Sequence, residues 1–133
     1  MGYSTRFKGE IRIDSPIPFD DVTGHGFTRE EPFKVTKDIR LKVVEEPIPG
    51  QPGGYRRIAV AIVGLDGGFS CYDAIPDTQE IIDRWGEGRT FTGRLDASGE
   101  EAGDVWRMEI RDGRADEVRP RIVWPDGSEG LSS

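Results

Sequence analysis

The sequence predicts an α+β fold, a mostly antiparallel sheet of about five to seven strands with one main helix packed on one face. Two observations predict this class. In several runs, apolar side chains alternate with polar ones, which is the period of a half-buried strand. Only residues 77–85 carry apolar side chains at helical spacing, and a helix this short depends on packing against a sheet.

The first predicted strand covers residues 5–13, where apolar and charged side chains alternate. The Ser-Pro-Ile-Pro run at 15–18 should end it, because each proline removes a hydrogen-bond donor from the ladder. Pro18 can then open a short helical turn through Val22.

Two further strands, 38–45 and 57–63, are predicted to form a hairpin around a wide proline- and glycine-rich loop at 47–54. The second of these strands is more continuously apolar, as expected for a central strand. An Asp-Gly-Gly turn at 66–68 should lead into a short strand near 69–72.

The predicted helix has Asp77 as its N-cap and Glu80 three residues later, which is the spacing of a capping box. An apolar stripe that includes Ile82 should face the sheet. Gly86 and Gly88 are expected to end the helix in the left-handed conformation.

Three more strands are predicted at 90–96, 104–111 and 115–124. An Asp-Gly pair joins the last two as a tight turn. Pro120 indicates that the last strand lies at an edge of the sheet, because proline cannot donate to a ladder.

The chain has 133 residues, about one domain, which we expect at 1–124, followed by a frayed polar tail at 125–133. The inward-facing positions of the predicted elements make up the expected core: Phe7, Ile11, Ile13, Leu41, Val43, Ile58, Val60, Ile62, Ile82, Trp85, Phe91, Leu95, Trp106, Met108, Ile110 and Ile122.

Composition excludes several classes of function. The net charge of −7 repels phosphate backbones and disfavours nucleic-acid binding. No run approaches the roughly 18 apolar residues that a membrane span needs, and the first residues contain no apolar leader segment. Cys71 is the one cysteine, so no intrachain disulfide can form. These features predict a cytoplasmic protein without a membrane partner.

The residues also offer little catalytic chemistry. His25 is the one histidine, and a dyad with Cys71 would need a third, orienting group. The sequence contains neither a phosphate-binding loop nor a nucleophile elbow. We therefore expect no cofactor and no catalytic residues, and the sequence favours a protein that is not an enzyme without deciding the question.

An acidic loop, residues 96–104, is the best candidate for a binding site. Hard cations prefer oxygen ligands of this kind, but Glu101 and Arg107 stand where a calcium-binding EF-hand loop needs Gly and Glu. A solvated hairpin tip, a weak divalent-cation site and a protein contact all stay open, and so does the presence of a metal. The candidate residues are the four carboxylates and the tryptophan that follows them: Asp96, Glu100, Glu101, Asp104 and Trp106.

Basic residues are predicted on the outward face of the sheet, a pattern found in some RNA-binding sheets. Those sheets place aromatic residues between the charges, whereas Phe7, Phe91 and Trp106 fall in the opposite register here. Glu10 and Glu109 interrupt the basic stripe, which favours cross-strand ion pairs on a solvated face.

Five blocks of the sequence, one of them Asp-Gly-Arg at 112–114, resemble a family of small uncharacterised proteins from actinobacteria and their phages. The other four are the opening Met-Gly-Tyr-Ser-Thr-Arg-Phe-Lys-Gly-Glu-Ile at 1–11, Thr-Phe-Thr-Gly-Arg-Leu at 90–95, Gly-Glu-Glu-Ala-Gly-Asp-Val-Trp-Arg at 99–107 and Pro-Arg-Ile-Val-Trp-Pro-Asp-Gly at 120–127. The family is a domain of unknown function, so the resemblance implies a phage or prophage origin and carries over no catalytic residue, cofactor or partner.

Two hypotheses follow. The first is a non-enzymatic protein-binding module, an accessory factor that acts on a host or phage protein. The second is a divalent-cation-dependent enzyme or ligand sensor that uses the 96–104 loop. An enzyme site needs the four carboxylates to converge in a pocket, whereas a binding module can leave them splayed on a convex tip.

Overall fold

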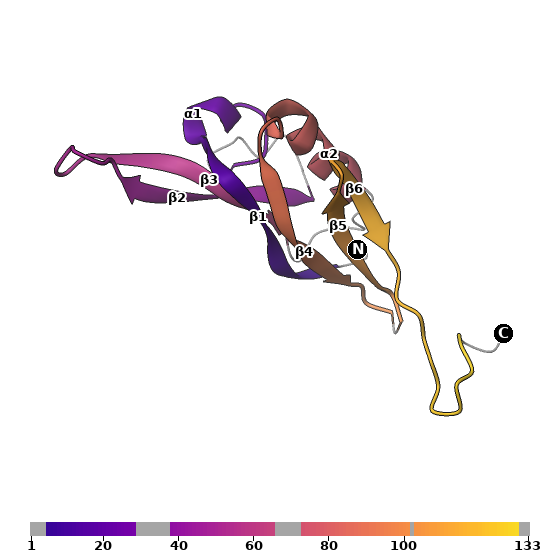
Figure 1. Ribbon diagram of the computed structural model, residues 1–133. Helices are drawn as coiled ribbons and strands as arrows, with labels where there is room; N and C mark the ends of the chain where they lie inside the picture. The colour runs from indigo at the N-terminus through magenta and orange to yellow at the C-terminus, as the bar shows by residue number, and fades with distance from the viewer. Residues whose placement is uncertain (1–4, 29–37, 66–72, 102, 131–133) are drawn as a thin grey trace.

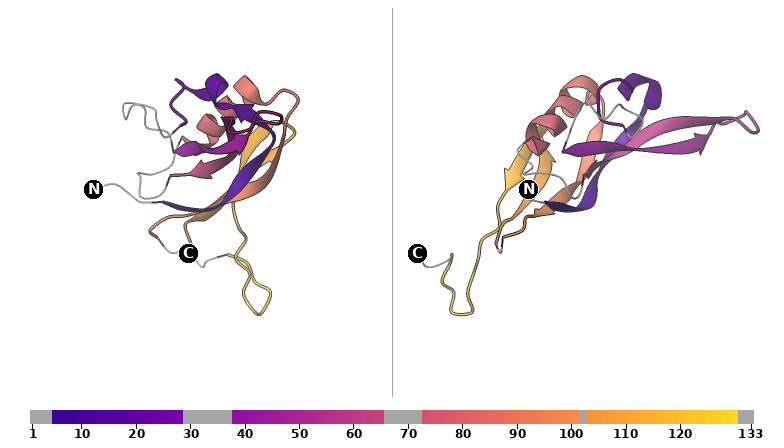
Figure 2. Two further views of the ribbon diagram at one scale, coloured as in Figure 1. Left: turned by 90° about the vertical axis from the view of Figure 1, so that its left-hand side faces the viewer. Right: turned by 180° about the vertical axis from the view of Figure 1, so that it is seen from behind.

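The computed structural model describes residues 5–28, 38–65, 73–101 and 103–130. Six strands in these ranges form one antiparallel sheet with the order β2-β3-β1-β4-β5-β6, and both helices pack on the same face of it (Figures 1 and 2). The predicted α+β class is confirmed. The elements are β1 (Arg6–Pro18), α1 (Phe19–Val22), β2 (Ile39–Pro47), β3 (Tyr55–Gly64), α2 (Ala74–Trp85), β4 (Thr90–Ser98), β5 (Val105–Arg111) and β6 (Arg114–Val118).

The core lies between the inner face of the sheet and the two helices. Ile11 of β1, Ile62 of β3 and Leu95 of β4 are fully buried there, and α2 contributes Ile81. Each such side chain adds about 1.5–3 kcal/mol of stability relative to an exposed one. Because β1 pairs with both β3 and β4, this first strand of the chain organises the centre of the sheet.

The prolines at 15–18 do not end β1, which corrects the prediction. Ser15 adopts a left-handed φ of 70°, and the register with β3 shifts between Arg12 and Ile17. This irregularity absorbs the prolines, so the strand continues and buries Ile17 completely. The side chain of Arg89 stabilises the bend by donating to the Ser15 carbonyl at 2.7 Å. The short helical turn after Pro18 is confirmed as α1.

A second irregularity changes which residues of β3 face the core. Lys42 of β2 pairs with Ala61 and Val43 pairs with Ala59, so Val60 is an extra residue in β3. Val60 is therefore only half-buried, where the alternating pattern predicted a core position, and the two alanines beside it are buried instead. The central placement of β3, between β2 and β1, is confirmed.

Helix α2 begins at Ala74, three residues before the predicted start. Proline is tolerated in the first turn, so Pro76 lies inside the helix. Asp77 is not the N-cap but a buried residue of that turn, and its carboxylate accepts a hydrogen bond from the Asp38 backbone N–H at 3.2 Å. Gly86 ends the helix in a right-handed conformation, and only Gly88, at φ 74°, is left-handed as predicted.

The last strand is shorter than predicted. β6 ends at Val118, before Pro120, and its edge position is confirmed. The Asp-Gly pair does form the tight turn into β6, with φ values of 50° and 75° at Asp112 and Gly113. Ile122, predicted in the core, lies beyond β6 and is 36% exposed.

Two projections extend from opposite ends of the sheet (Figure 1). The first, which we call the arm, is the outer part of the β2–β3 hairpin, residues 44–57. The second, the tail hairpin, is residues 121–130, where Val123 and Glu129 form an antiparallel bridge. The division of the chain into a domain at 1–124 and a tail at 125–133 stays a prediction.

The predicted turn at 66–68, the strand at 69–72 and Cys71 lie outside the described residues. Neither described helix is long and apolar enough to cross a membrane.

Candidate functional site

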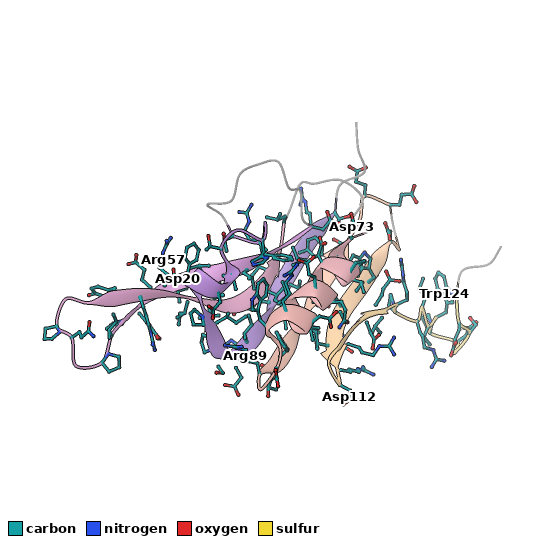
Figure 3. All side chains as sticks on the ribbon, turned by 90° about the horizontal axis from the view of Figure 1, so that it is seen from above. Asp20, Arg57, Asp73, Arg89, Asp112 and Trp124 are labelled. Atoms are coloured by element: carbon teal, nitrogen blue, oxygen red, sulfur yellow. The ribbon has the colours of Figure 1, made fainter. Side chains whose placement is uncertain are left out.

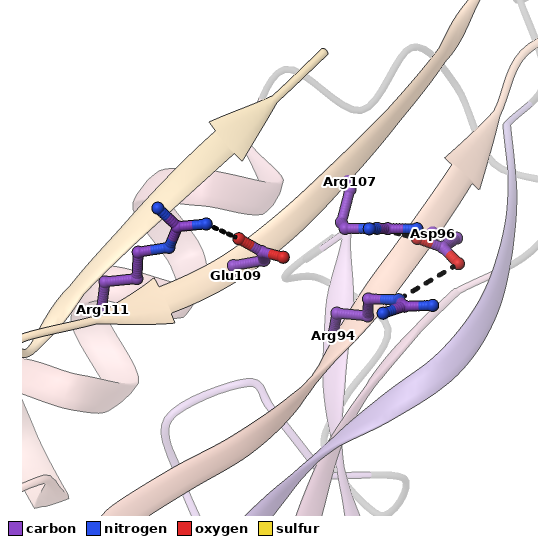
Figure 4. Close-up of polar contacts among 5 residues, drawn as sticks. All are labelled: Arg94, Asp96, Arg107, Glu109 and Arg111. Carbon is purple, nitrogen blue, oxygen red and sulfur yellow. Dashed lines mark hydrogen bonds and ion pairs between the residues drawn. The ribbon is translucent and has the colours of Figure 1, made fainter. Parts of the chain in front are cut away.

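The acidic loop separates into parts with different surroundings. Asp96 belongs to β4 and lies directly opposite Arg107 of β5. Its carboxylate accepts a hydrogen bond from Arg107 Nε at 2.6 Å and pairs with Arg94 Nε at 3.7 Å (Figure 4). Two arginines of the same sheet therefore neutralise this carboxylate.

The remaining carboxylates lie in or beside the turn between β4 and β5. The Gly99 N–H donates to the Asp104 carbonyl at 2.8 Å, and the Asp104 N–H donates to the Glu101 carbonyl at 3.1 Å, which closes a tight turn. Asp104 pairs with Arg119 at 3.5 Å, whereas Glu100 and Glu101 lie exposed at the tip. The structure thus does not bring the four predicted carboxylates together.

This arrangement favours arginine pairing over cation binding. In the described ranges, no group of three or more His, Cys, Asp and Glu side chains is close enough to hold a metal ion. A hard divalent cation needs several oxygen ligands at once, and arginines already occupy Asp96 and Asp104. The described carboxylates of the loop are therefore not arranged as a cation site.

Trp106 points toward the core face and serves packing. Its ring meets Phe7 edge to face, with centroids 6.0 Å apart and an interplanar angle of 87°. It is half-buried and packs against the core cluster. Trp106 therefore supports the acidic loop from below instead of extending it into solvent.

A groove lies beside the acidic loop, where β6 leaves β5. β6 pairs with β5 as far as Val118 opposite Arg107, and beyond that point Trp106 and Val105 of β5 pair with β4 but have no residue of β6 opposite them. The groove has a volume of about 360 Å³ and combines apolar and charged walls. We call it the β5–β6 groove, lined by Lys8, Asp96, Ala97, Ser98, Val105, Trp106, Arg107, Val118, Arg119 and Pro120.

The outer face of the sheet carries paired charges, as predicted. Glu10 lies within 3.5 Å of both Lys42 and Arg12, and Glu109 pairs with Arg111 at 2.6 Å (Figure 4). Exposed pairs of this kind contribute at most about 1 kcal/mol each. Glu10 and Glu109 thus interrupt the basic stripe with ion pairs, as the sequence predicted.

Exposed apolar side chains identify a surface that the sequence patterns did not predict. Tyr55, on the arm, is 63% exposed, and in the tail hairpin Val123 is 60% and Trp124 47% exposed. Trp124 lies at the opposite end of the molecule from the arm (Figure 3). The Asp-Gly pair at 126–127, which follows Val-Trp-Pro, was a turn signal that could have indicated this hairpin.

Hydrogen bonds within the tail hairpin hold its shape. The Gly130 N–H donates to the Ile122 carbonyl at 2.7 Å, and the Trp124 N–H donates to the Ser128 carbonyl at 2.8 Å. The Trp124 indole donates to the Gly130 carbonyl at 2.6 Å. Asp126 accepts from the Ser128 backbone and hydroxyl, and these bonds lower the pKa of its carboxyl.

His25 and Asp38 take part in the packing and hydrogen bonding of the fold. His25 packs edge to face on Trp85, with ring centroids 5.2 Å apart. The Asp38 carboxylate accepts a hydrogen bond from the Asp73 N–H at 3.0 Å, directly before α2, and burial raises the pKa of this carboxyl. This bond satisfies the backbone N–H of Asp73, the N-cap residue, and so ties the start of α2 to the residue before β2.

Comparison with known proteins gives a family and no function. Residues 1–133 match a family described as a family of unknown function, DUF6205. No curated protein and no solved structure matches the chain.

Proposed function

The chain belongs to this family of unknown function, and we propose that it is a protein-binding module whose contact surfaces are the arm and the tail hairpin. The partner class is a host or phage protein, and the module acts as an accessory factor in the cytoplasm. The proposal rests on the surface of the molecule and on the resemblance of its sequence to small phage and actinobacterial proteins.

One observation carries the proposal. Four of the five large apolar side chains exposed among the described residues lie on the two projections: Tyr55, Ile122, Val123 and Trp124. Single exposed apolar residues are common, but Ile122, Val123 and Trp124 follow one another on an extended segment of the projecting hairpin and so leave apolar side chains on both of its faces, which another molecule can cover. Tryptophan and tyrosine are also the residues most enriched at energetically important interface positions.

The acidic loop supports this role in a second way. Glu100 and Glu101 are exposed in the β4–β5 turn, where the neighbouring Asp104 pairs with Arg119 shortly before the tail hairpin, and the chain has a net charge of −7. A negative rim beside an apolar contact favours partners with basic surfaces and increases their rate of association. In this proposal the carboxylates select the partner, and the apolar side chains provide most of the binding free energy.

Site-specific photo-crosslinking in cells tests the proposal. A photoreactive phenylalanine analogue is placed at Tyr55, at Trp124 and, as a control, at Glu87, which is exposed just after α2. We expect a discrete crosslinked species from each projection and none from the control. Equal labelling at all three positions, or no adduct from either projection, would contradict the binding role.

A further inference from the structure

The outer face of the sheet is not covered by either helix, because both helices pack on the inner face (Figures 1 and 2). On β1, β2, β4 and β5, basic residues of the outer face alternate with buried residues of the core. Strand pairing places these basic residues in adjacent rows at the centre of the sheet. They form what we call the basic face: Lys8, Arg12, Lys42, Arg94 and Arg107.

The Asp96 carboxylate lies among three of these cations. Arg107 Nε is 2.6 Å and Arg94 Nε 3.7 Å from its oxygens, one on either side of it (Figure 4). Lys8 lies opposite Asp96 on β1, is exposed and forms no ion pair within the described residues. One negative charge is therefore surrounded by three positive ones, and the ion pairs leave two positive charges unbalanced.

The Glu10 carboxylate is shared between two further cations. Its oxygens lie 3.5 Å from Arg12 Nε and 3.5 Å from Lys42 Nζ. One of these two positive charges is again unbalanced. With the ion pairs counted, the basic face and its two carboxylates thus carry an excess of three positive charges, in a chain whose net charge is −7.

Residues at the margins of the outer face do not cancel this excess. Toward β6, Glu109 pairs with Arg111 at 2.6 Å, and β6 places one residue of each sign opposite them. Toward the other margin, Arg6 and Arg40 outnumber Asp14. The outer face is therefore positive as a whole, although the rest of the chain is strongly negative.

The chemistry of the basic face selects an anionic partner. Guanidinium groups bind carboxylates and phosphates through two N–H groups that are held in a fixed fork. The surroundings of Asp96 show that arginines of adjacent strands already hold a carboxylate at this place. Aspartate and glutamate side chains of another protein can bind the unbalanced cations in the same way.

Two observations favour a protein over a nucleic acid as the source of the negative charge. The aromatic residues of β1, β4 and β5 pack against the core, so this face offers no ring on which a base can stack. The net charge of −7 also repels the long phosphate backbone of a duplex. A short acidic segment touches the basic face alone, and salt screens the other charges of the chain beyond about 8 Å.

We propose that the basic face binds an acidic segment of another protein, one with several aspartates or glutamates in a single stretch. This surface is separate from the arm and the tail hairpin, so the inference goes beyond the proposed function and does not depend on it. It gives the molecule a second contact surface, which selects its partner by the opposite charge from the acidic loop.

Fluorescence anisotropy with a labelled oligoglutamate peptide tests the inference. We expect saturable binding at physiological ionic strength that weakens as salt is added, because salt screens exposed ion pairs. An oligoglutamine peptide of equal length should not bind. A chain of net charge −7 repels a polyanion except at a local positive surface, so binding of the peptide reports on such a surface.

Charge variants locate the binding on the basic face. Lys8→Gln removes an unpaired cation and should weaken binding by about threefold, whereas Glu10→Gln removes a competing carboxylate and should strengthen it by about threefold. Arg84→Gln and Glu80→Gln make the same charge changes in an ion pair of α2, on the other face of the sheet, and should leave binding unchanged. All four side chains are accessible to solvent, and circular dichroism checks that each variant folds.

Three results would overturn the inference: an oligoglutamate peptide that does not bind, variants of the basic face that behave like those of α2, or a DNA duplex of equal charge that binds more tightly than the peptide and responds to the same variants. The last result would assign the face to a nucleic acid. The photo-crosslinking experiment judges the arm and the tail hairpin separately, so the two proposals can fail independently.

Discussion

Replacing Gly64 with alanine tests the packing between the first strand and the centre of the sheet. Gly64 ends β3, and the Phe7 side chain lies directly on it. A Cβ atom at position 64 would come within 2.1 Å of Phe7 Cγ, 2.3 Å of Cδ2 and 2.5 Å of Cβ. Non-bonded carbons need about 3.5 Å, so Phe7 must move by more than an ångström or the two strands must separate.

The expected cost is at the upper end of the range for overpacking. Extra methyl groups in a packed core cost about 1–3 kcal/mol. Phe7 has little room to move, since it is 9% exposed and Trp106 meets its ring edge to face at 6.0 Å. We therefore expect Gly64→Ala to lower the free energy of unfolding by about 3 kcal/mol, and the melting temperature by about 10 °C.

Urea unfolding of a double-mutant cycle measures this contact. In a Phe7→Ala background, two of the three clashing atoms are gone, so the cost of Gly64→Ala should fall by at least about 1 kcal/mol. Gly54→Ala in the arm is a matched control, because the nearest atoms lie 3.2 Å from its Cβ position and should adjust easily. If Gly64→Ala is as mild as the control, or if its cost does not depend on Phe7, this account of the core is wrong.

Three further predictions concern the candidate site and the helix cap. Trp106→Ala should lower the free energy of unfolding by about 2 kcal/mol, less than for a fully buried tryptophan, and thermal melting checks this. Millimolar calcium should leave the melting temperature unchanged, because arginines pair with Asp96 and Asp104. A rise in the melting temperature that disappears in the double variant Glu100→Gln, Asp104→Asn would refute the arginine interpretation. Burial raises the pKa of the Asp38 carboxyl above its ordinary value of 3.8. Between these two pKa values the folded state binds more protons than the unfolded state, so this group lowers the stability of the protein as the pH rises through that window. Asp38→Asn keeps an acceptor for the Asp73 N–H and should remove this part of the pH dependence, whereas Asp38→Ala should cost about 1 kcal/mol; urea unfolding at acidic and neutral pH distinguishes them.

Local patterns predicted the strands well, because alternation reports which face of a strand is buried. Phe7, Ile11 and Ile13 are all buried on one face of β1, and Asp112 with Gly113 forms the expected turn. The class, the edge position of the last strand and the central position of β3 follow from such local signals. They depend on residues within a few positions of each other, which a sequence shows directly.

The errors arose where distant partners decide the local structure. Val60 matches a core position of a regular strand, and only the pairing with Lys42 and Val43 shows that β3 carries an extra residue there. Asp77 has the spacing of a helix cap, but the carboxylate of Asp38, a residue far away in the chain, takes the position before α2 instead. A capping box cannot be distinguished from a buried aspartate without knowing what packs against the first turn.

The sequence also does not show which basic residues pair with the carboxylates of the acidic loop. Counted along the chain, four carboxylates in nine residues suggest a cation site, because the partners of each carboxylate are not visible. Across the sheet, Arg107 lies opposite Asp96, and Arg119 reaches Asp104 from beyond β6. Antiparallel pairing thus places Asp96 opposite a basic residue of the next strand, whereas Glu100 and Glu101 lie exposed in the turn. The structure therefore brings no group of three or more metal-ligating side chains together in the part of the chain that it describes.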